Sequence, residues 1–221
     1  MVPGSDLIVM SVSAHPPDDL ANDASYIGRA LLVNGNRIVV SEQRFQDELH
    51  TKGFGEKEGT EYLLKPYEAL YLAYVKRLEL HDGSKSTTGD KNGQFDFDSL
   101  FEVLVRQDKS ILTRFLIYRD LRSRGYIAKE GFGFGIDFRV YGRGEFEKKP
   151  AKYVVFAINE GTNAKARKFF TMIEQIEKMG KEAIIAVIER RGEIIYYKAS
   201  RMRFGENHYN TKVRSAGALL T

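Results

Sequence analysis

Apolar and polar positions in the first forty residues follow the two-residue period of strands. Residues 7–12 alternate weakly and are β-branched, which predicts a strand. Residues 30–33 and 37–40 are apolar segments on either side of Asn34-Gly35, a dipeptide typical of tight hairpin turns. We therefore expect the chain to start as a small sheet, with the second and third segments paired as a hairpin.

The period then changes to that of helices. Residues 42–51 carry apolar side chains at helical spacing, and a second helix is predicted over residues 65–74, where Pro66 is tolerated in the first turn. Residues 78–81 favour a closing strand. Residues 82–94 contain no large apolar side chain, which is typical of a linker or a long loop.

After this segment, the pattern predicts two helices, three strands, one more helix and two final strands. Ser110 is expected to cap the second of these helices, which runs up to Gly125, and Gly180 is expected to end the third. The predicted helices are at 97–105, 110–125 and 163–179, and the predicted strands at 126–129, 138–141, 153–158, 183–189 and 193–200, the last two joined by a tight turn at 190–192.

These elements predict an α+β protein built from two domains. A small N-terminal α/β domain is expected at 1–81, and a C-terminal domain with a mixed sheet at 95–204. Residues 82–94 are the expected linker, and 205–221 an expected tail with little pattern. No internal repeat is found.

Composition places the chain among ordinary globular proteins. Of its 221 residues, 43% are hydrophobic and 29% are charged, which excludes long disorder. There is no Cys, which excludes disulfides, thiolate catalysis and Cys-ligated zinc. The 34 basic and 30 acidic residues give a net charge of +4, which permits a polyanionic partner without requiring one.

Metal, cofactor and membrane sites have no signature in the sequence. The four histidines, at 15, 50, 81 and 208, lie far apart and in no metal-binding spacing, so no metal and no cofactor are expected. Apolar runs such as 183–188 are far shorter than the ~20 residues of a membrane-spanning helix, and residues 1–10 lack the cationic start of a signal peptide. The expected location is the cytoplasm, with no membrane partner.

Common catalytic motifs are not found either. The glycine-rich residues 131–135 lack the Gly-Lys-Ser/Thr ending of a phosphate-binding loop and precede a predicted strand, so they favour a structural turn. No serine lies in a nucleophile-elbow context, and the carboxylates show no spacing distinctive of hydrolysis.

The informative residues lie in the C-terminal domain. Residues 116–129 read LIYRDLRSRGYIAK, residues 133–144 read GFGIDFRVYGRG and residues 152–156 read KYVVF. This combination closely resembles the archaeal tRNA-splicing endonucleases, whose catalytic domain carries YRDLRxRGY, FGxxFRVYxRG and HxxY in that order. Residues 181–188 and 192–197 resemble the closing strands of that family, and residues 53–56 and 66–72 resemble elements of its N-terminal domain.

The resemblance implies a metal-independent cleavage of RNA. In that family a tyrosine takes the proton of the 2′-hydroxyl, a histidine protonates the leaving 5′-oxygen and a lysine stabilises the charged phosphorane, which leaves a 2′,3′-cyclic phosphate and a 5′-hydroxyl. This division of roles among three residues is physically sensible. The 2′-hydroxyl nucleophile is already next to the phosphorus, so the protein has to supply only proton transfer and charge stabilisation.

Two of these three residues carry over to this sequence. Tyr141 matches the tyrosine and Lys181 matches the lysine, whereas Pro150 stands at the position of the histidine. Loss of a general acid typically costs about 10²–10⁴ in rate. A further departure is Glu174, which stands where the family often places a basic residue facing RNA. A carboxylate at this position would repel the phosphate backbone.

Each motif residue also has an ordinary interpretation. Tyr141 is then a packed aromatic at a strand end, and Lys181 a solvated cation near a helix end.

The candidate RNA-binding residues are Arg139 and Arg143. A basic strip on the second helix of the C-terminal domain, made of Arg119, Arg122 and Arg124, is either RNA-facing or an ordinary exposed helix face.

The resemblance also implies a second subunit. Residues of the last strand are expected to dock edge to edge with another protomer: Glu193, Ile194, Ile195, Tyr196 and Tyr197. An acidic turn is expected to enter a basic cleft of the partner, although the matching residues 189–193 are less acidic than the family pattern.

Three hypotheses follow. The first is a non-catalytic, structural subunit of a heterotetrameric tRNA-splicing endonuclease, which acts on precursor tRNA together with a catalytic subunit. The second is an endonuclease that is active by itself through Tyr141 and Lys181, with self-association, and its apparently full N-terminal domain supports this. The third is an RNA-binding module without nuclease activity, for which no aromatic sheet signature is found.

Overall fold

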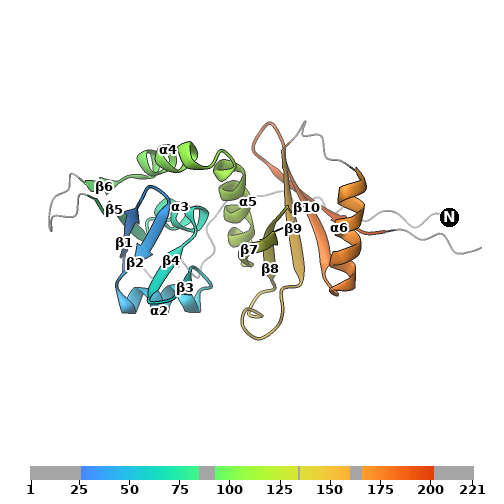
Figure 1. The fold of residues 1–221 in the computed structure, drawn as a ribbon, viewed down its shortest axis with the longest axis horizontal. Coiled ribbons are helices and arrows are strands. Elements are labelled where there is room, and N and C mark those ends of the chain that lie inside the picture. The colour runs from blue at the N-terminus through green and yellow to red at the C-terminus, as the bar shows by residue number, and fades with distance from the viewer. Residues whose placement is uncertain (1–25, 85–92, 134, 160–165, 202–221) are drawn as a thin grey trace, which may run out of the picture.

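The computed structural model describes residues 26–84, 93–133, 135–159 and 166–201, and contains two sheets with helix α5 between them (Figure 1). The expected α+β class, with a smaller N-terminal unit before a mixed-sheet unit, is confirmed. The strand expected at 7–12 and the tail at 205–221 lie outside the described residues. In the part that is described, no helix is both long and apolar enough to cross a membrane.

The first sheet contains six strands in the order β3-β4-β2-β1-β5-β6. Its strands and associated helices are β1 (Gly28–Val33), β2 (Arg37–Val40), α2 (Gln43–Thr51), β3 (Glu56–Glu58), β4 (Glu61–Leu64), α3 (Pro66–Tyr74), β5 (Leu78–Asp82) and β6 (Gln94–Phe95). The predicted hairpin is confirmed: Val33 pairs with Arg37, and Asn34 and Gly35 have φ values of 53° and 77°. Two successive positive φ values are what a type I′ turn requires.

Three strands of this sheet are not predicted by the sequence. β3 is a short, polar edge strand without apolar alternation, and it exists because it pairs with β4. β4 in turn pairs with β2, with Leu64 opposite Ile38 in the core. β6 adds two residues to the edge of β5. Their strand conformation depends on pairing with neighbours more than on local pattern.

The second sheet contains five strands in the order β11-β10-β9-β8-β7. Its elements are α4 (Phe97–Gln107), α5 (Ile111–Ser123), β7 (Ile127–Gly133), β8 (Ile136–Tyr141), β9 (Tyr153–Asn159), α6 (Ala166–Lys178), β10 (Glu182–Ile188) and β11 (Ile194–Ala199). The predicted order of helices and strands is confirmed. β9 and β10 are parallel and connected through α6, and the other neighbouring pairs are antiparallel.

Ser110 occupies the N-cap position of α5, as predicted, but the expected capping bond is not formed. The side chain of Ser110 makes no capping hydrogen bond to the helix. Its hydroxyl and its backbone N–H instead both donate to Asp108 Oδ1, at 2.7 and 2.8 Å. Asp108 therefore takes over the local hydrogen bonding, since a carboxylate is a stronger acceptor than a hydroxyl.

One large hydrophobic core extends across both sheets. The ring of Tyr118 on α5 lies 5.0 Å from that of Tyr67 on α3 and 6.1 Å from that of Phe138 on β8, measured between centroids. A smaller core, with Val154, Ile173 and others, lies between α6 and its strands. The domain boundary at 82–94 stays a prediction, and the two sheets share their main apolar contacts through α5.

Candidate active site

Three neighbouring strands bring the predicted catalytic positions to one end of the second sheet. Tyr141 ends β8, Pro150 lies shortly before β9, and Lys181 lies directly before β10. Backbone hydrogen bonds fix this alignment: Lys152 N–H donates to Val140 O, and Glu182 N–H donates to Lys152 O, both at 3.0 Å. Residues far apart in the sequence therefore meet at one edge.

Lys181 is held by the backbone beside Pro150. Its Nζ donates to the carbonyl of Ala151 at 2.6 Å, and the side chain is half-buried. Among the residues that the structure describes, no carboxylate lies within 4.0 Å of this amine. The lysine therefore offers a cation whose charge is not neutralised by an ion pair.

Tyr141 packs against an aromatic ring of the loop that follows it. Its ring meets that of Phe146 edge to face, with 5.1 Å between centroids and an angle of 88° between planes. The Phe146 ring also contacts Lys129, whose Nζ lies 5.6 Å from the centroid of this ring. Phe146, which the sequence does not single out, thus links Tyr141 to the boundary between the two sheets.

The loop between β8 and β9 is compact. Lys149 N–H donates to Glu145 O at 2.9 Å, and Lys149 Nζ lies 2.7 Å from Glu145 Oε1. The hydrogen bond from Lys149 lowers the pKa of the Glu145 carboxyl. The Glu145 carboxylate also lies close to the backbone of Gly142, within 2.3 Å of where a Cβ would stand.

A histidine of the N-terminal unit contacts the same loop. His50 Nε2 on α2 lies 3.2 Å from Glu147 Oε1. Glu147 has a φ of 63°, in the left-handed region that non-glycine residues rarely adopt. Of the two histidines in the described ranges, His50 and His81, it is His50 that pairs with a side chain of this loop. The loop that carries Pro150 is therefore braced against α2.

Glu174 does not present a free carboxylate. Its Oε1 lies 3.2 Å from both Lys178 Nζ and Arg201 Nη1. The hydrogen bond from Lys178 lowers the pKa of Glu174. A similar arrangement lies next to Lys181, where Lys198 Nζ approaches Glu182 Oε2 at 2.8 Å and lowers the pKa of that carboxyl. Both acids are thus paired with cations inside the chain.

The two predicted RNA-binding arginines have different surroundings. Arg143 is exposed, and its Nε and Nη2 donate to the carbonyl of Arg124 at 2.9 and 2.5 Å. Arg139 lies over the ring of Phe132, 5.3 Å from its centroid, with Nη2 3.5 Å from Glu56 Oε1. Arg143 lies two residues after Tyr141 in the chain, whereas Arg139 contacts Glu56 of the N-terminal unit.

The predicted arginine strip is divided between interior and surface. Arg122 is buried, with Nη2 donating to Lys52 O at 3.1 Å and its guanidinium 4.2 Å from the centroid of Phe54. Arg124 pairs with Asp120 through a 2.7 Å contact. Arg119 remains half-exposed on the outside of α5.

The predicted interface residues alternate between the two faces of β11. Ile194 is buried, and Tyr196 donates its hydroxyl to Asp120 Oδ2 at 2.8 Å. Burial raises the pKa of Tyr196 well above its ordinary value. Glu193 and Tyr197 are exposed, and Ile195 is half-buried. β11 is the outer strand, paired with β10 along one side.

Comparison with protein families gives two matches in the order of the two sheets. The model described as tRNA intron endonuclease, N-terminal domain, matches residues 30–91, and the one described as tRNA intron endonuclease, catalytic C-terminal domain, matches residues 111–196. This chain belongs to the tRNA intron endonuclease family. The family to which it belongs cleaves tRNA introns.

Similar proteins named tRNA-splicing endonuclease come from several archaea. The Methanococcus vannielii protein is 28% identical over 171 residues, which cover 77% of this chain and 93% of that protein. The Thermococcus onnurineus and Pyrococcus furiosus proteins are 27% and 25% identical over 173 residues, which cover 78% of this chain and 95% of each relative. The similarity thus extends over nearly the whole length of these relatives.

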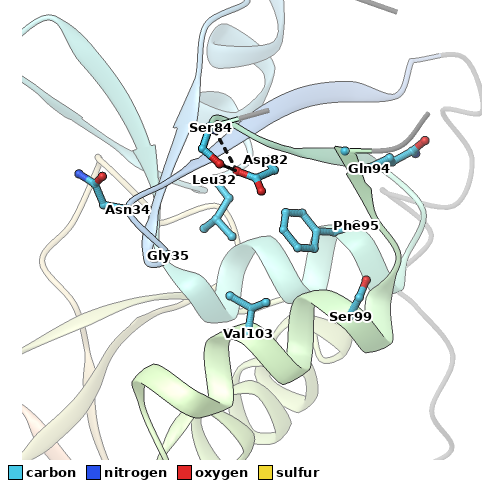
Figure 2. Close-up of a pocket in the computed structure, with 10 residues that line it drawn as sticks. Leu32, Asn34, Gly35, Asp82, Ser84, Gln94, Phe95, Ser99 and Val103 are labelled. Atoms are coloured by element: carbon cyan, nitrogen blue, oxygen red, sulfur yellow. Dashed lines mark hydrogen bonds between the residues drawn. The ribbon is translucent and has the colours of Figure 1, made fainter. Parts of the chain in front are cut away.

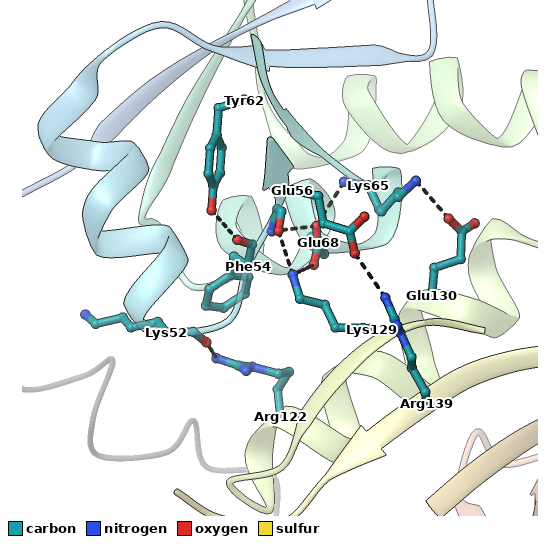
Figure 3. A network of polar contacts seen from close by, with 11 residues as sticks. Lys52, Phe54, Glu56, Tyr62, Lys65, Glu68, Arg122, Lys129, Glu130 and Arg139 are labelled. Carbon is teal, nitrogen blue, oxygen red and sulfur yellow. Dashed lines mark hydrogen bonds and ion pairs between the residues drawn. The ribbon is translucent and has the colours of Figure 1, made fainter. Parts of the chain in front are cut away.

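The family elements of the N-terminal unit meet the C-terminal unit at a buried polar network (Figure 3). Glu68, 1% exposed, accepts the N–H groups of Gly55 and Lys65, each at 3.0 Å. Lys129 from β7 donates to Gly55 O at 2.6 Å and lies 3.7 Å from Glu68 Oε1. Sequence analysis identifies residues 53–56 and 66–72 only as family elements, and their contact with Lys129 was missed.

A second group of ion pairs surrounds this network. Lys65 Nζ lies 2.8 Å from Glu130 Oε2, and Arg139 reaches Glu56. Burial raises the pKa of Glu68 and lowers that of Lys129. In this chain the two sheets are therefore joined by buried charges as well as by apolar contact.

The pocket shown in Figure 2 lies elsewhere. It has a volume of about 590 Å³ and is lined by residues of β1, β5, β6 and α4, among them Leu32, Asp82, Phe95 and Val103. It borders the N-terminal sheet rather than the end of β8, β9 and β10, so it is not part of the candidate site. Within the described ranges, no three His, Asp or Glu side chains form a group that could hold a metal ion.

Proposed function

We propose that this chain is the structural subunit of a heterotetrameric tRNA-splicing endonuclease that removes introns from precursor tRNA at bulge-helix-bulge junctions. The products of the assembly are a 2′,3′-cyclic phosphate and a 5′-hydroxyl, and a partner subunit supplies the complete set of catalytic residues. The observation that carries the proposal is Pro150, which stands at the general-acid position in the loop before β9.

The chemistry explains why this substitution matters. The leaving 5′-oxygen needs a proton as its bond to phosphorus breaks, and a positioned acid typically contributes about 10²–10⁴ in rate. Proline has no group that can donate a proton. A site with Tyr141 and Lys181 alone can remove the 2′-hydroxyl proton and stabilise the phosphorane, yet it leaves the departing alkoxide unprotonated.

The surroundings of the two retained residues also support a structural role. Lys181 is bonded to Ala151 O, the residue that follows Pro150, and Tyr141 packs against Phe146. These contacts keep Tyr141 and Lys181 in place, but position 150 supplies no third titratable side chain. The outer strand β11, with its second edge free of any described strand, offers a surface on which a partner subunit can add.

A second candidate function is an endonuclease that acts by itself. The convergence of Tyr141 and Lys181 at one end of the sheet favours it, and so does the match of the N-terminal family model to residues 30–91. In that case water or another group protonates the leaving oxygen. This reading ranks second, because it requires an acid that the aligned position does not provide.

The deciding experiment incubates the purified chain with a bulge-helix-bulge RNA and assays the 2′,3′-cyclic phosphate. The wild type is compared with Pro150→His, which restores an acid at the aligned position, and with Lys148→His, which places a histidine at an exposed position in the same loop. We expect silence from the wild type and the control, and cleavage only by Pro150→His if the scaffold is otherwise competent.

The outcomes separate the two functions. Cleavage by the lone wild type would overturn the structural-subunit proposal and favour the second candidate. If the wild type, Pro150→His and Lys148→His all fail to cleave the RNA, the result supports a structural subunit whose site lacks more than one catalytic group. If Pro150→His does cleave the RNA, the double variant Pro150→His with Lys181→Ala tests whether the rescued cleavage uses the aligned lysine.

A further inference from the structure

Arg119 is the member of the predicted arginine strip that is neither buried nor ion-paired. Its guanidinium carbon lies 5.6 Å from the ring centroid of Tyr74 and 5.7 Å from that of Phe115. No carboxylate of the described residues lies within 4.0 Å of it, in contrast to Arg124, which pairs with Asp120. The guanidinium therefore lies within cation–π distance of both rings, and among the described residues no ion pair neutralises its charge.

Ring contacts join Arg119, through Tyr74 on α3, to aromatic side chains of α4, and Leu112 lies seven residues before Arg119 on α5. Tyr74 and Leu112 are each 46% exposed, and Phe97 and Phe101 are half-buried. The Tyr74 ring lies 6.2 Å from that of Phe97, and Phe97 stacks on Phe101 at 6.3 Å with 11° between planes. We call these five residues, Tyr74, Phe97, Phe101, Leu112 and Arg119, the aromatic–arginine surface.

Three carboxylates neighbour this surface along the chain, and two of them have partners of their own. Asp108 accepts two hydrogen bonds from Ser110. Glu102 pairs with Arg106 at 3.5 Å. Asp98 lies in the first turn of α4, where the helix dipole favours a carboxylate.

Two exposed lysines lie near the residues of this surface along the chain. Lys76 lies two residues after Tyr74, and Lys109 lies three residues before Leu112. Neither has a carboxylate within 4.0 Å among the residues of the described ranges. With Arg119 they are three cations without an ion pair in the described part of the chain, against the two carboxylates Asp98 and Asp108, so the charge beside the exposed ring of Tyr74 is positive, which complements an anion that carries a flat, apolar group.

We propose that the aromatic–arginine surface binds an unpaired nucleotide of RNA. The base stacks on Tyr74 and on the guanidinium plane of Arg119, and the adjoining phosphates lie near Lys76 or Lys109. Aromatic and arginine side chains are the usual platforms for unpaired bases, whereas a base inside a duplex has no free face to offer. The proposal rests on the proposed function, from which it takes RNA as the ligand class, and it adds a site separate from Tyr141 and Lys181.

The test measures equilibrium binding of the full-length chain to single-stranded oligouridine and to a blunt RNA duplex. The variants are Arg119→Gln and Tyr74→Ala, with Tyr74→Phe to retain the ring. Arg29→Gln is the matched control, because Arg29 is an exposed arginine of β1 that is paired with Glu79. Circular dichroism confirms that each variant keeps the fold.

Loss of one stacked base is expected to weaken oligouridine binding about tenfold for Arg119→Gln and for Tyr74→Ala. Tyr74→Phe and Arg29→Gln should stay within about twofold of the wild type, since the first keeps the ring and the second lies outside the surface. Duplex binding should not respond to Tyr74→Ala. Photo-crosslinking with 4-thiouridine should label the peptide that contains Tyr74.

Several results would overturn the surface as a nucleotide site. These are unchanged oligouridine binding in both variants, equal loss with the duplex, or a loss of subunit assembly while the RNA affinity is unchanged, which would identify a protein-docking face. The proposed function is tested separately, because cleavage by the lone wild type would overturn the structural-subunit role and leave this binding result intact.

Discussion

Lys129 and Lys181 donate to a backbone carbonyl over the same distance, 2.6 Å, yet their surroundings are opposite. Lys129 is buried between the two sheets, and the buried carboxylate of Glu68 lies 3.7 Å away. Lys181 lies half-buried at the end of the second sheet, without a carboxylate within 4.0 Å among the described residues. A lysine that joins two parts of a protein needs a fixed counter-charge, whereas one that faces a phosphate is more useful without one.

The largest expected effect is on the buried lysine. Lys129→Met removes the cation and leaves Glu68 buried without its counter-charge, which should lower the free energy of unfolding by about 3–5 kcal/mol. Chemical denaturation of the full chain measures this. The double variant Lys129→Met with Glu68→Gln should recover part of the loss, because the uncompensated charge is then gone. A loss as large in the double variant would show that packing, and not charge, dominates.

The next effect is a dependence on pH. Burial raises the pKa of Glu68 above its ordinary value of 4.5, so between that value and the raised pKa the folded protein holds a proton that the unfolded chain has released. Raising the pH through this window therefore lowers the free energy of unfolding, by about 1.4 kcal/mol per unit of pKa difference. Glu68→Gln should remove this slope. An identical slope in the variant, measured by denaturation at several pH values, would mean that Glu68 is not its source.

A smaller effect is expected at the end of the second sheet. Lys181→Met removes one hydrogen bond to Ala151 O and should cost only about 0.5–1.5 kcal/mol of stability. The same substitution should leave the activity of an assembled, partner-containing enzyme nearly unchanged if this chain is structural. A large loss of cleavage in a correctly assembled complex would instead make Lys181 a catalytic residue.

The smallest effect concerns the brace on the loop that carries Pro150. The side chains of His50 and Glu147 are 58% and 57% exposed, so their pair is screened by water and should contribute about 0–1 kcal/mol. His50→Ala is therefore expected to change the denaturation midpoint very little. A loss as large as that of Lys129→Met would show that the loop, and not the buried network, holds the two sheets together.

Local pattern predicted most elements of the fold, for identifiable reasons. The Asn34-Gly35 hairpin, the helix that starts at Pro66 and the end of α6 near Gly180 each depend on residues within a few positions. β3 was missed because its residues, Glu56–Glu58, form a strand only by pairing with β4. Ser110 was predicted as a cap, but the neighbouring Asp108 is the stronger acceptor.

For the candidate site, the motif order identified Tyr141, Pro150 and Lys181, and the structure brings their three strand ends together. Their roles, and those of Arg139, Arg143 and the β11 residues, stay predictions. Phe146 and Ala151 were missed, because a ring that packs on Tyr141 and a carbonyl that accepts from Lys181 have no signature in a single sequence.

The sequence by itself determined the family, the order of helices and strands in the C-terminal unit, and the absence of a histidine at position 150, because these depend on residue identity and on local period. Only the tertiary structure decided which charges are buried together and which arginine stays outside. Glu68 and Lys129 are distant in the chain and meet across two sheets, and Arg122 and Arg119 on one helix face opposite environments. Burial and pairing are properties of the packed molecule, and they set the charge that each side chain presents.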